Sequence, residues 1–192
     1  MSRIVLILAV IVVLLVVGGF TLQRVFAVKN APMPATGQAA PTFTLPNQEG
    51  QPVDLATYRG QWVVLYFYPK DMTTGCTIEA HNFQRDLDQY KELHAVILGV
   101  SLDTVDSHKE FCTKDSLQFT LLADPDGKVV QQYGSLGNLG PIHMANRNTF
   151  LINPEGRIVK VWTKVSPSSH SAEVLAAIAG AERARKGLGI RD

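Results

Sequence analysis

The chain has 192 residues, which is enough for one domain with a full hydrophobic core and a short additional segment. Its 18 lysines and arginines nearly balance its 17 aspartates and glutamates, without the basic cluster that nucleic-acid binding requires, so we expect no nucleic-acid partner. The two cysteines, Cys76 and Cys112, are too few for a disulfide scaffold. No histidine pair at ligand spacing completes a zinc site with them, and we expect no metal or other cofactor.

The N-terminal region differs in character from the rest of the chain. Residues 4–20 are apolar without interruption and the next two residues extend the run, which brings it near the lower limit for a membrane-spanning helix. We predict that residues 1–26 form a transmembrane anchor that crosses the membrane through residues 4–22. The alternative is a secretory signal peptide cleaved after Ala27, but Arg24 and Phe26 crowd that cleavage site.

The charges beside the apolar run do not decide its orientation, because Arg3 lies on one side and Arg24 and Lys29 lie on the other. A short N-terminal tail usually stays in the cytoplasm. We therefore expect a single-pass protein of a bacterial inner membrane whose main domain faces the periplasm, or a secreted protein if the segment is cleaved. Residues 27–41 contain three prolines and little apolar periodicity, which predicts an exposed, semi-stiff linker.

Apolar runs alternate with amphipathic segments from residue 42 to the end of the chain. After a short hairpin over 43–55, we expect strands at 62–68, 95–100 and 119–122, with helices over about 76–93, about 105–116 and from Pro125 onward. A glycine-rich loop over 134–141, a β-hairpin over 149–162 and a helix over about 171–185 complete the chain. This order predicts one α/β domain, residues 42–192, with a mixed sheet flanked by helices.

The segment from Pro69 to Glu79 joins the first buried strand to the first long helix. Proline ends the strand, Thr73 or Thr74 can cap the helix, and Gly75 allows the backbone to turn tightly. Cys76 follows in the first helical turn. Helical spacing places it on one apolar stripe with Ala80, Phe83, Leu87 and Tyr90.

A cysteine in this position supports two interpretations. The partial positive charge and unpaired N–H groups at a helix N-terminus favour the thiolate, which is the nucleophilic form of the side chain. Alternatively, Cys76 is a small buried hydrophobic residue, as many free cysteines are. The position of Cys76 alone does not decide between them.

The motif Pro69-x-x-x-Thr73-x-x-Cys76 resembles the active site of peroxiredoxins. The longer text is similar to the bacterioferritin comigratory protein branch of that family, also called the Q-type peroxiredoxins, and this similarity covers about residues 37–181. It implies a thioredoxin-like fold. The matching segments are Phe67–Asp71, Gly75–Ala80, Asp124–Gly127 and Arg147–Ile152.

The resemblance also implies a role for five residues. Cys76 would be the peroxidatic cysteine, which attacks a peroxide oxygen and becomes a sulfenic acid. Thr73 would direct its hydroxyl at the sulfur and the peroxide, and Pro69 would shield the thiolate from water. Arg147 would keep Cys76 ionised and stabilise charge on the peroxide oxygens, and Glu79 would orient Arg147.

The chain departs from the family pattern at two positions. Thr74 stands where the family usually has proline, and His81 stands where many members carry a resolving cysteine. Another subset of the branch carries that cysteine on the next helix, so the resemblance implies that Cys112 is the resolving cysteine. Alternatively, Cys112 only packs beneath its helix, because it shares a helical face with His108.

The implied function is a thiol peroxidase that reduces hydrogen peroxide and organic hydroperoxides and forms an intramolecular Cys76–Cys112 disulfide. A thioredoxin or thioredoxin-like reductant would recycle it, and we expect a monomer, as is frequent in this branch. A disulfide needs Cα atoms within about 7 Å, so the first turn of the Cys76 helix is expected to unwind on oxidation.

Two alternative functions stay open. One is a membrane-anchored thiol–disulfide oxidoreductase, although such enzymes use Cys-x-x-Cys and this chain has Thr73-x-x-Cys76. The other is a non-catalytic redox sensor, which would need the same reactive thiol. Turnover that depends on peroxide would distinguish the enzyme from both.

Overall fold

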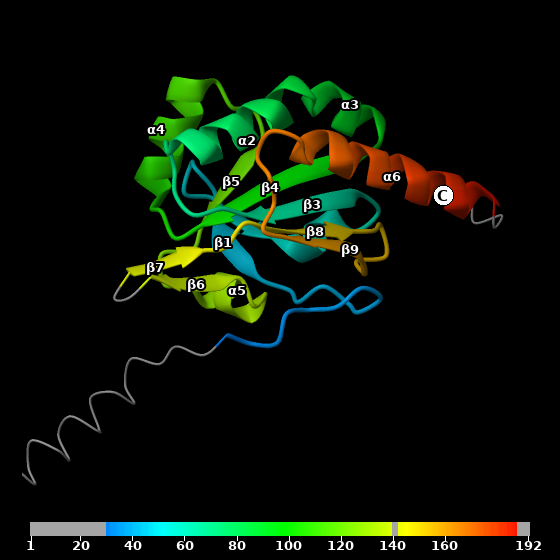
Figure 1. Cartoon of the computed structure of the whole chain (residues 1–192), viewed down its shortest axis with the longest axis horizontal. Coiled ribbons are helices and arrows are strands. Elements are labelled where there is room, and N and C mark those ends of the chain that lie inside the picture. The colour runs from blue at the N-terminus through cyan, green and yellow to red at the C-terminus, as the bar shows by residue number, and fades with distance from the viewer. Residues whose placement is uncertain (1–29, 140–141, 188–192) are drawn as a thin grey trace, which may run out of the picture.

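The computed structural model describes residues 30–139 and 142–187 (Figure 1). The predicted anchor, residues 4–22, and the predicted domain boundary at residue 26 lie outside the described residues. Within the described ranges, no helix combines the length and the apolar character needed to cross a membrane.

A five-stranded mixed sheet forms the centre of the domain, with strand order β5-β4-β3-β8-β9 (Figure 1). Strands β3, β4 and β5 are parallel to one another, whereas β8 pairs antiparallel with β3 and with β9. The three predicted buried strands and the predicted hairpin are therefore confirmed. The strands are β3 (Trp62–Phe67), β4 (Ala95–Ser101), β5 (Thr120–Ala123), β8 (Asn148–Ile152) and β9 (Ile158–Thr163).

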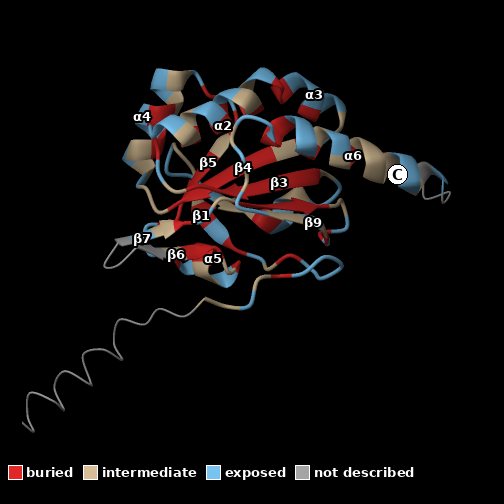
Figure 2. Ribbon diagram, viewed as in Figure 1, coloured by how far each residue is buried: buried red, intermediate tan, exposed pale blue. Residues whose placement is uncertain are grey.

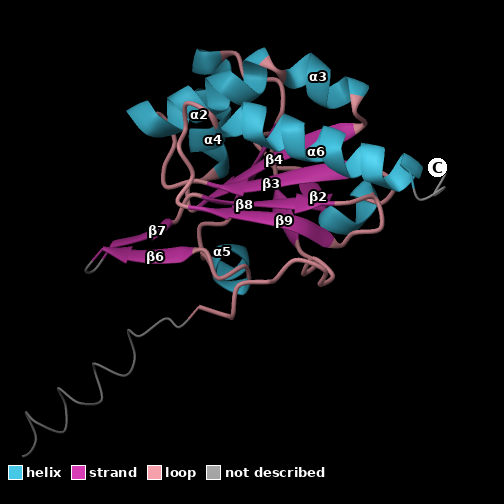
Figure 3. Ribbon diagram, turned by 45° about the vertical axis from the view of Figure 1, so that its right-hand side comes forward, coloured by secondary structure: helices cyan, strands magenta, loops and turns pink. Residues whose placement is uncertain are grey.

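Four helices cover one face of this sheet, as Figure 3 shows from the side. They are α2 (Thr74–Arg85), α3 (Leu87–Glu92), α4 (Val105–Asp115) and α6 (His170–Gly187). The other face is covered by a short helix, a 3₁₀ turn and two small hairpins. These are α5 (Lys128–Gln132), η1 (Leu55–Tyr58), β1 (Thr44–Pro46) with β2 (Pro52–Asp54), and β6 (Leu136–Leu139) with β7 (Ile142–Ala145).

The central strand β3 separates two hydrophobic clusters. Val63, Leu65 and Phe67 contribute to the cluster under α5, whereas Val64 and Tyr66 contribute to the cluster under the four helices. This alternation follows from the two-residue period of a strand. Every residue of β3 is buried, so it appears red at the centre of the molecule in Figure 2. The strand therefore ends inside the protein, where the segment that begins at Pro69 leads into α2.

The predicted helix over 76–93 is wrong in one respect, because the structure divides it at Asp86 into α2 and α3. The backbone of Asp86 leaves the helical region at φ −95° and ψ 5°. Its carboxylate accepts hydrogen bonds from Arg85 and from Ser171 Oγ of α6, the latter at 2.7 Å. These side-chain contacts hold Asp86 at the junction between the two helices. The predicted apolar stripe is confirmed nevertheless, since all five of its residues are buried.

The predicted loop over 134–141 is also wrong, because β6 and β7 form an antiparallel hairpin there, with Leu136 opposite Ala145. Glycine usually weakens a strand prediction. Here Gly137 has a packing reason: a Cβ atom at this position would lie 2.6 Å from Asn146 Oδ1. The segment therefore pairs as a hairpin despite its glycine content.

The part of the predicted linker that the structure describes, residues 30–41, is docked on the domain. The N–H groups of Gly37 and Ala40 donate to the carbonyls of Ile158 and Gly156 at 2.7 and 3.0 Å. Residues 35–39 are exposed, as predicted, but Pro34 and Ala40 are buried and fasten the segment to the domain.

Helix α5 begins at Lys128 and not at Pro125, because Pro125 lies in the turn before it. The N-cap residue is Gly127, and the Asp124 carboxylate accepts the otherwise unpaired N–H groups of Lys128 and Val130 in the first turn, at 3.1 and 2.8 Å.

Candidate active site

Cys76 is the third residue of α2 and is 2% exposed. Of the two predicted capping residues, Thr73 is the N-cap, but its side chain makes no capping hydrogen bond to the backbone. Its hydroxyl lies instead 2.9 Å from Cys76 Sγ and 3.0 Å from the carbonyl oxygen of Lys70. The Thr73 hydroxyl therefore contacts the sulfur and does not make the hydrogen bond to the helix backbone that an N-cap side chain usually makes.

The sharp turn before α2 is made by Met72 and not by Gly75. Met72 has φ 57°, in the left-handed region, whereas Gly75 is not among the residues with positive φ. Gly75 has a different use. A Cβ atom at this position would lie 2.8 Å from Arg147 Nη2, so glycine leaves space for that side chain.

Arg147 connects the sulfur to a buried carboxylate. It lies between β7 and β8, and its Nη2 donates to Cys76 Sγ at 3.1 Å. Its Nη1 donates to Glu79 Oε2 at 2.6 Å, and Glu79 is 1% exposed. The structure therefore brings together four of the predicted site residues: Thr73, Cys76, Glu79 and Arg147.

The two charged groups of this site have opposite responses to burial. Burial raises the pKa of Glu79 to about 7, although the charge and the hydrogen bond of Arg147 act in the other direction. Burial tends to lower the pKa of Arg147, but the neighbouring Cys76 and Glu79 outweigh it, and the net shift of the Arg147 pKa is upward. Glu79 Oε1 is buried and has no hydrogen-bond partner in the described part of the chain. Arg147 is therefore a permanent cation beside the sulfur, while its carboxylate partner is only partly satisfied.

Two predicted site residues stand apart from this group. Pro69 is half-buried at the end of β3, where it begins the active-site loop, which we define as residues 69–73. Cys112 lies on α4, is partly buried, and packs against the hydrophobic cluster that includes Cys76. Both cysteines are free. Burial, together with the negative charges of Glu49 and Asp71, raises the pKa of Cys112 to about 12.

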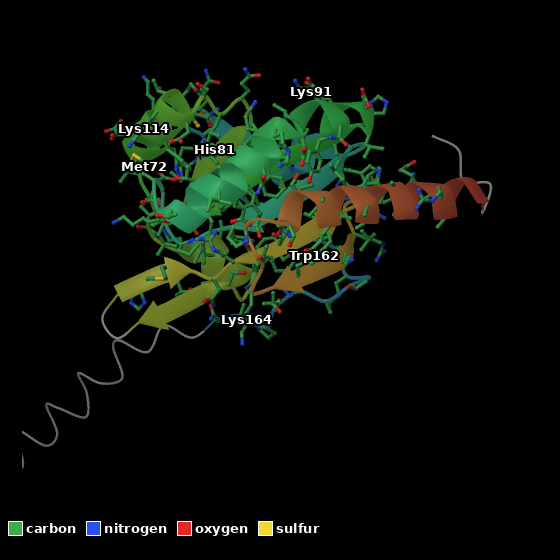
Figure 4. The ribbon with its side chains drawn as sticks, turned by 45° about the horizontal axis from the view of Figure 1, so that its top comes forward. Met72, His81, Lys91, Lys114, Trp162 and Lys164 are labelled. Carbon is green, nitrogen blue, oxygen red and sulfur yellow. The ribbon has the colours of Figure 1, made fainter. Side chains whose placement is uncertain are left out.

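His81 occupies the position at which the resemblance led us to look for a resolving cysteine. Its Nε2 lies 2.8 Å from Asp115 Oδ1 of α4, so this side chain bridges α2 and α4 at the surface. Figure 4 shows His81 and Met72 on the helical side of the molecule. Sequence reasoning missed Asp71, which is 3% exposed beside the loop, because an aspartate after Pro-Lys resembles an ordinary turn residue.

Comparison with known proteins identifies the family. Residues 36–161 match the AhpC/TSA family. Peroxiredoxin Bcp of Bacillus subtilis is 44% identical over 143 residues, which covers 72% of this chain and 91% of that protein. Peroxiredoxin Bcp of Escherichia coli K12 is 38% identical, with 72% and 92% covered.

Solved structures agree with these matches. The peroxidoxin BcpB of Mycobacterium tuberculosis superposes with a TM-score of 0.72 at 32% identity, covering 77% of this chain and 97% of that one. Peroxiredoxin Q of Xanthomonas campestris gives 0.69 at 37% identity, covering 72% and 90%. The predicted thioredoxin-like α/β fold with a mixed sheet is thereby confirmed. The chain belongs to the AhpC/TSA family and is a peroxiredoxin of the Bcp branch, and hence a thiol peroxidase.

Proposed function

We propose that the chain reduces hydrogen peroxide and organic hydroperoxides, with Cys76 as the peroxidatic cysteine. The observation that carries this proposal is the pair of donors on one buried sulfur: Thr73 Oγ1 at 2.9 Å and Arg147 Nη2 at 3.1 Å. Both donors stabilise negative charge on the sulfur, and both can also contact the oxygens of a bound peroxide. A related structure, of the Xanthomonas campestris bacterioferritin comigratory protein, concerns alkyl peroxide reduction by that protein and includes a trapped intermediate.

The first step is an in-line displacement at oxygen. The Cys76 thiolate attacks the terminal peroxide oxygen, an S–O bond forms, the O–O bond breaks, and the leaving oxygen takes up a proton as water or an alcohol. Cys76 becomes a sulfenic acid. Thr73 and Arg147 align the peroxide and stabilise charge on the departing oxygen. Glu79 holds Arg147 in place, and Pro69 limits the access of water.

The second step is resolution by Cys112. Its sulfur attacks the sulfenic acid of Cys76, which forms the disulfide and releases water. The two residues lie on different helices, so the start of α2 unwinds to bring them together. The matched structures of Xanthomonas campestris peroxiredoxin Q include variants with serine at either of two cysteines, 36 positions apart, and Cys76 and Cys112 have the same separation.

A thioredoxin or thioredoxin-like dithiol completes the cycle. One of its thiolates attacks the Cys76–Cys112 disulfide, and its second thiol releases the reduced peroxiredoxin. The proposed enzyme is a monomer, and the cycle requires no second copy of the chain, since both cysteines belong to one chain.

The test compares the full chain with its Cys76→Ser and Cys112→Ser variants. Peroxide consumption is followed with thioredoxin, thioredoxin reductase and NADPH. We expect no turnover without Cys76, and a single oxidation without continued turnover in Cys112→Ser. If Cys112→Ser turns over as fast as the natural chain, the resolving role is wrong. Reduction of insulin in the absence of peroxide would instead support a general thiol–disulfide oxidoreductase.

We also propose that residues 4–22 anchor the enzyme in the inner membrane with the peroxidase domain in the periplasm. The uninterrupted apolar run supports this proposal. Protease digestion of sealed inner-membrane vesicles of known orientation tests it, because a periplasmic domain is protected in inverted vesicles. An intact mass that lacks the first 27 residues would instead indicate a cleaved signal peptide.

A further inference from the structure

A buried polar cluster lies beside the active site and takes no part in the steps above. Asp71 of the active-site loop is 3% exposed and His108 of α4 is 0% exposed. The Asp71 carboxylate accepts hydrogen bonds from the hydroxyls of Tyr68 at 2.6 Å and Ser107 at 2.8 Å, and His108 Nδ1 lies 2.8 Å from it. These contacts tie the active-site loop to the helix that carries Cys112.

The backbone of Asp71 is tied to the same region. Its N–H donates to Asp103 Oδ2 at 2.9 Å, and Ser101 Oγ donates to the same oxygen at 2.7 Å. Burial tends to raise the pKa of Asp71, but the hydrogen bond and charge of His108 and the two hydroxyl donors outweigh it, so the pKa is lowered. Asp71 is therefore a charged group at neutral pH, held by several donors at once.

Two features offset part of the stability of this closed arrangement. His108 Nε2 is buried and has no hydrogen-bond partner among residues 30–139 and 142–187. An unpaired polar atom in the interior is unfavourable and can regain water when the structure opens. Met72, next to Asp71, has φ 57°, in the left-handed region that is unfavourable for a methionine. Both features make the closed arrangement less stable than a fully satisfied contact would be, so the contact between the loop and α4 is able to open.

The state of Cys112 depends on the same contact. Cys112 follows His108 by four residues, so the two lie one turn apart on the same side of α4. Burial and the negative charges of Glu49 and Asp71 raise the pKa of Cys112 to about 12, and a protonated thiol is a poor nucleophile. Movement of Asp71 away from α4 takes one of these charges away from the thiol.

We propose that Asp71 and His108 form a releasable clasp, which holds the active-site loop for peroxide reduction when closed and lets Cys112 reach the oxidised Cys76 when open. The clasp is the Asp71–His108 contact together with its hydroxyl donors, and the inference rests on the proposed resolving role of Cys112. Both residues are positioning residues, since they act on Cys76 only through the loop.

The clasp then sets the fate of the sulfenic acid. When it opens, the Cys112 thiol attacks the sulfenic sulfur, an S–S bond forms and water leaves. When it stays closed, a second peroxide molecule transfers an oxygen to the sulfenic acid, which becomes a sulfinic acid while the peroxide is reduced to water or an alcohol. A tighter clasp therefore favours the reduction of peroxide by Cys76, and it also favours the oxidation of Cys76 to the sulfinic acid.

Rapid-quench mass spectrometry of the full chain with hydrogen peroxide measures the two steps separately. Asp71→Asn keeps the shape of the side chain and removes its charge. We expect sulfenic acid to form about fivefold more slowly and the disulfide to form about fivefold faster, with less sulfinic acid at excess peroxide. His108→Leu should behave in the same way, whereas His108→Asn keeps an N–H donor near the Nδ1 position and should restore both rates.

Asp86→Asn is the matched control, because Asp86 is a buried carboxylate between α2 and α3 that does not belong to the clasp. In Asp86→Asn, the ratio between the rate of sulfenic acid formation and the rate of disulfide formation should be the same as in the natural chain. The clasp is overturned if Asp71→Asn leaves both rates unchanged or slows both by one common factor. If Asp71→Asn does not fold, the His108→Leu and His108→Asn pair decides by the same rates.

The experiments distinguish a failure of the clasp from a failure of the proposed resolving role of Cys112. The resolving role is decided by Cys112→Ser alone, through its turnover with thioredoxin. Asp71→Asn in the Cys112→Ser background still reports the rate of sulfenic acid formation, and so tests the closed clasp even if another thiol resolves Cys76.

Discussion

Arg147 Nη2 lies 3.1 Å from Cys76 Sγ, although 71 residues separate the two in the chain. The strand pairing explains this contact, because β8, which begins directly after Arg147, lies beside β3, which leads into the cysteine loop. The antiparallel β3–β8 pair thus delivers a cation to the start of α2. The sulfur is contacted by this guanidinium and also by the hydroxyl of Thr73, the N-cap residue of α2.

The first prediction concerns the geometry of this cation. Arg147→Lys keeps the charge, but one ammonium group does not replace a planar fork that contacts Cys76 and Glu79 at once. We expect the second-order rate of sulfenic acid formation to fall about 100-fold, as for the loss of one donor to a developing oxyanion. Stopped-flow measurement gives this rate, with exposed Arg183→Lys on α6 as the control. An unchanged rate in Arg147→Lys would mean that charge alone suffices.

The second prediction concerns the space beside Arg147. In Gly75→Ala the new Cβ would lie 2.8 Å from Arg147 Nη2, which is the movable end of a flexible side chain. The guanidinium should shift and release the sulfur, so peroxide reduction should slow by about 10- to 100-fold. The free energy of unfolding should not fall, since alanine is the better helix former.

Gly180→Ala on α6 is the control for this prediction, because its Cβ would meet only Arg183 Nη2, at 4.0 Å. It should leave the peroxidase rate unchanged. If Gly75→Ala loses activity only in proportion to a loss of stability, the steric explanation is incorrect.

The third prediction concerns the hydroxyl on the sulfur. Thr73→Val keeps the shape of the side chain and removes the donor to Cys76 Sγ, so the rate of sulfenic acid formation should fall about 100-fold. Thr73 makes no capping hydrogen bond through its side chain, so the stability of α2 should change little. Thr73→Ser retains the hydroxyl and should keep most of the rate. Equal rates in Thr73→Ser and Thr73→Val would exclude a role for the hydroxyl.

The fold was largely predictable because its strands are continuous apolar runs and its helices carry regular stripes. The β6–β7 hairpin was not, since Gly137 is required by a contact with Asn146 that no local pattern reports. Within the site, Glu79 is three residues after Cys76 on one helix, and such spacing places side chains on one face.

Site residues that are far apart in the sequence could not be predicted from local spacing. Arg147 was assigned only through resemblance, because its distance from Cys76 in the chain leaves no periodic signal. Asp71 belongs to a matching segment, but its burial and its role were not predicted, for the same physical reason. Its partner His108 is 37 residues away, and only the tertiary structure shows that this aspartate is buried.

The fourth prediction concerns the pH dependence of stability. The pKa of Glu79 is about 7 in the folded chain and near 4.3 when unfolded, so between these values the folded state binds a proton that the unfolded state has lost. The free energy of unfolding must therefore fall as pH rises from about 4.5 to about 7, by roughly 3 kcal/mol from this residue. Glu79→Gln does not titrate and should remove that decline.

The measurement is denaturant unfolding of both chains from pH 4 to pH 8, with exposed Glu92→Gln as the control. The difference in free energy between the natural chain and Glu79→Gln should decrease steadily as pH rises and level off above about pH 7. A carboxylate whose ion pair with Arg147 outweighed burial would give the opposite slope, with stability lost toward acid. The sign of the slope thus decides whether burial or the 2.6 Å ion pair dominates the ionisation of Glu79.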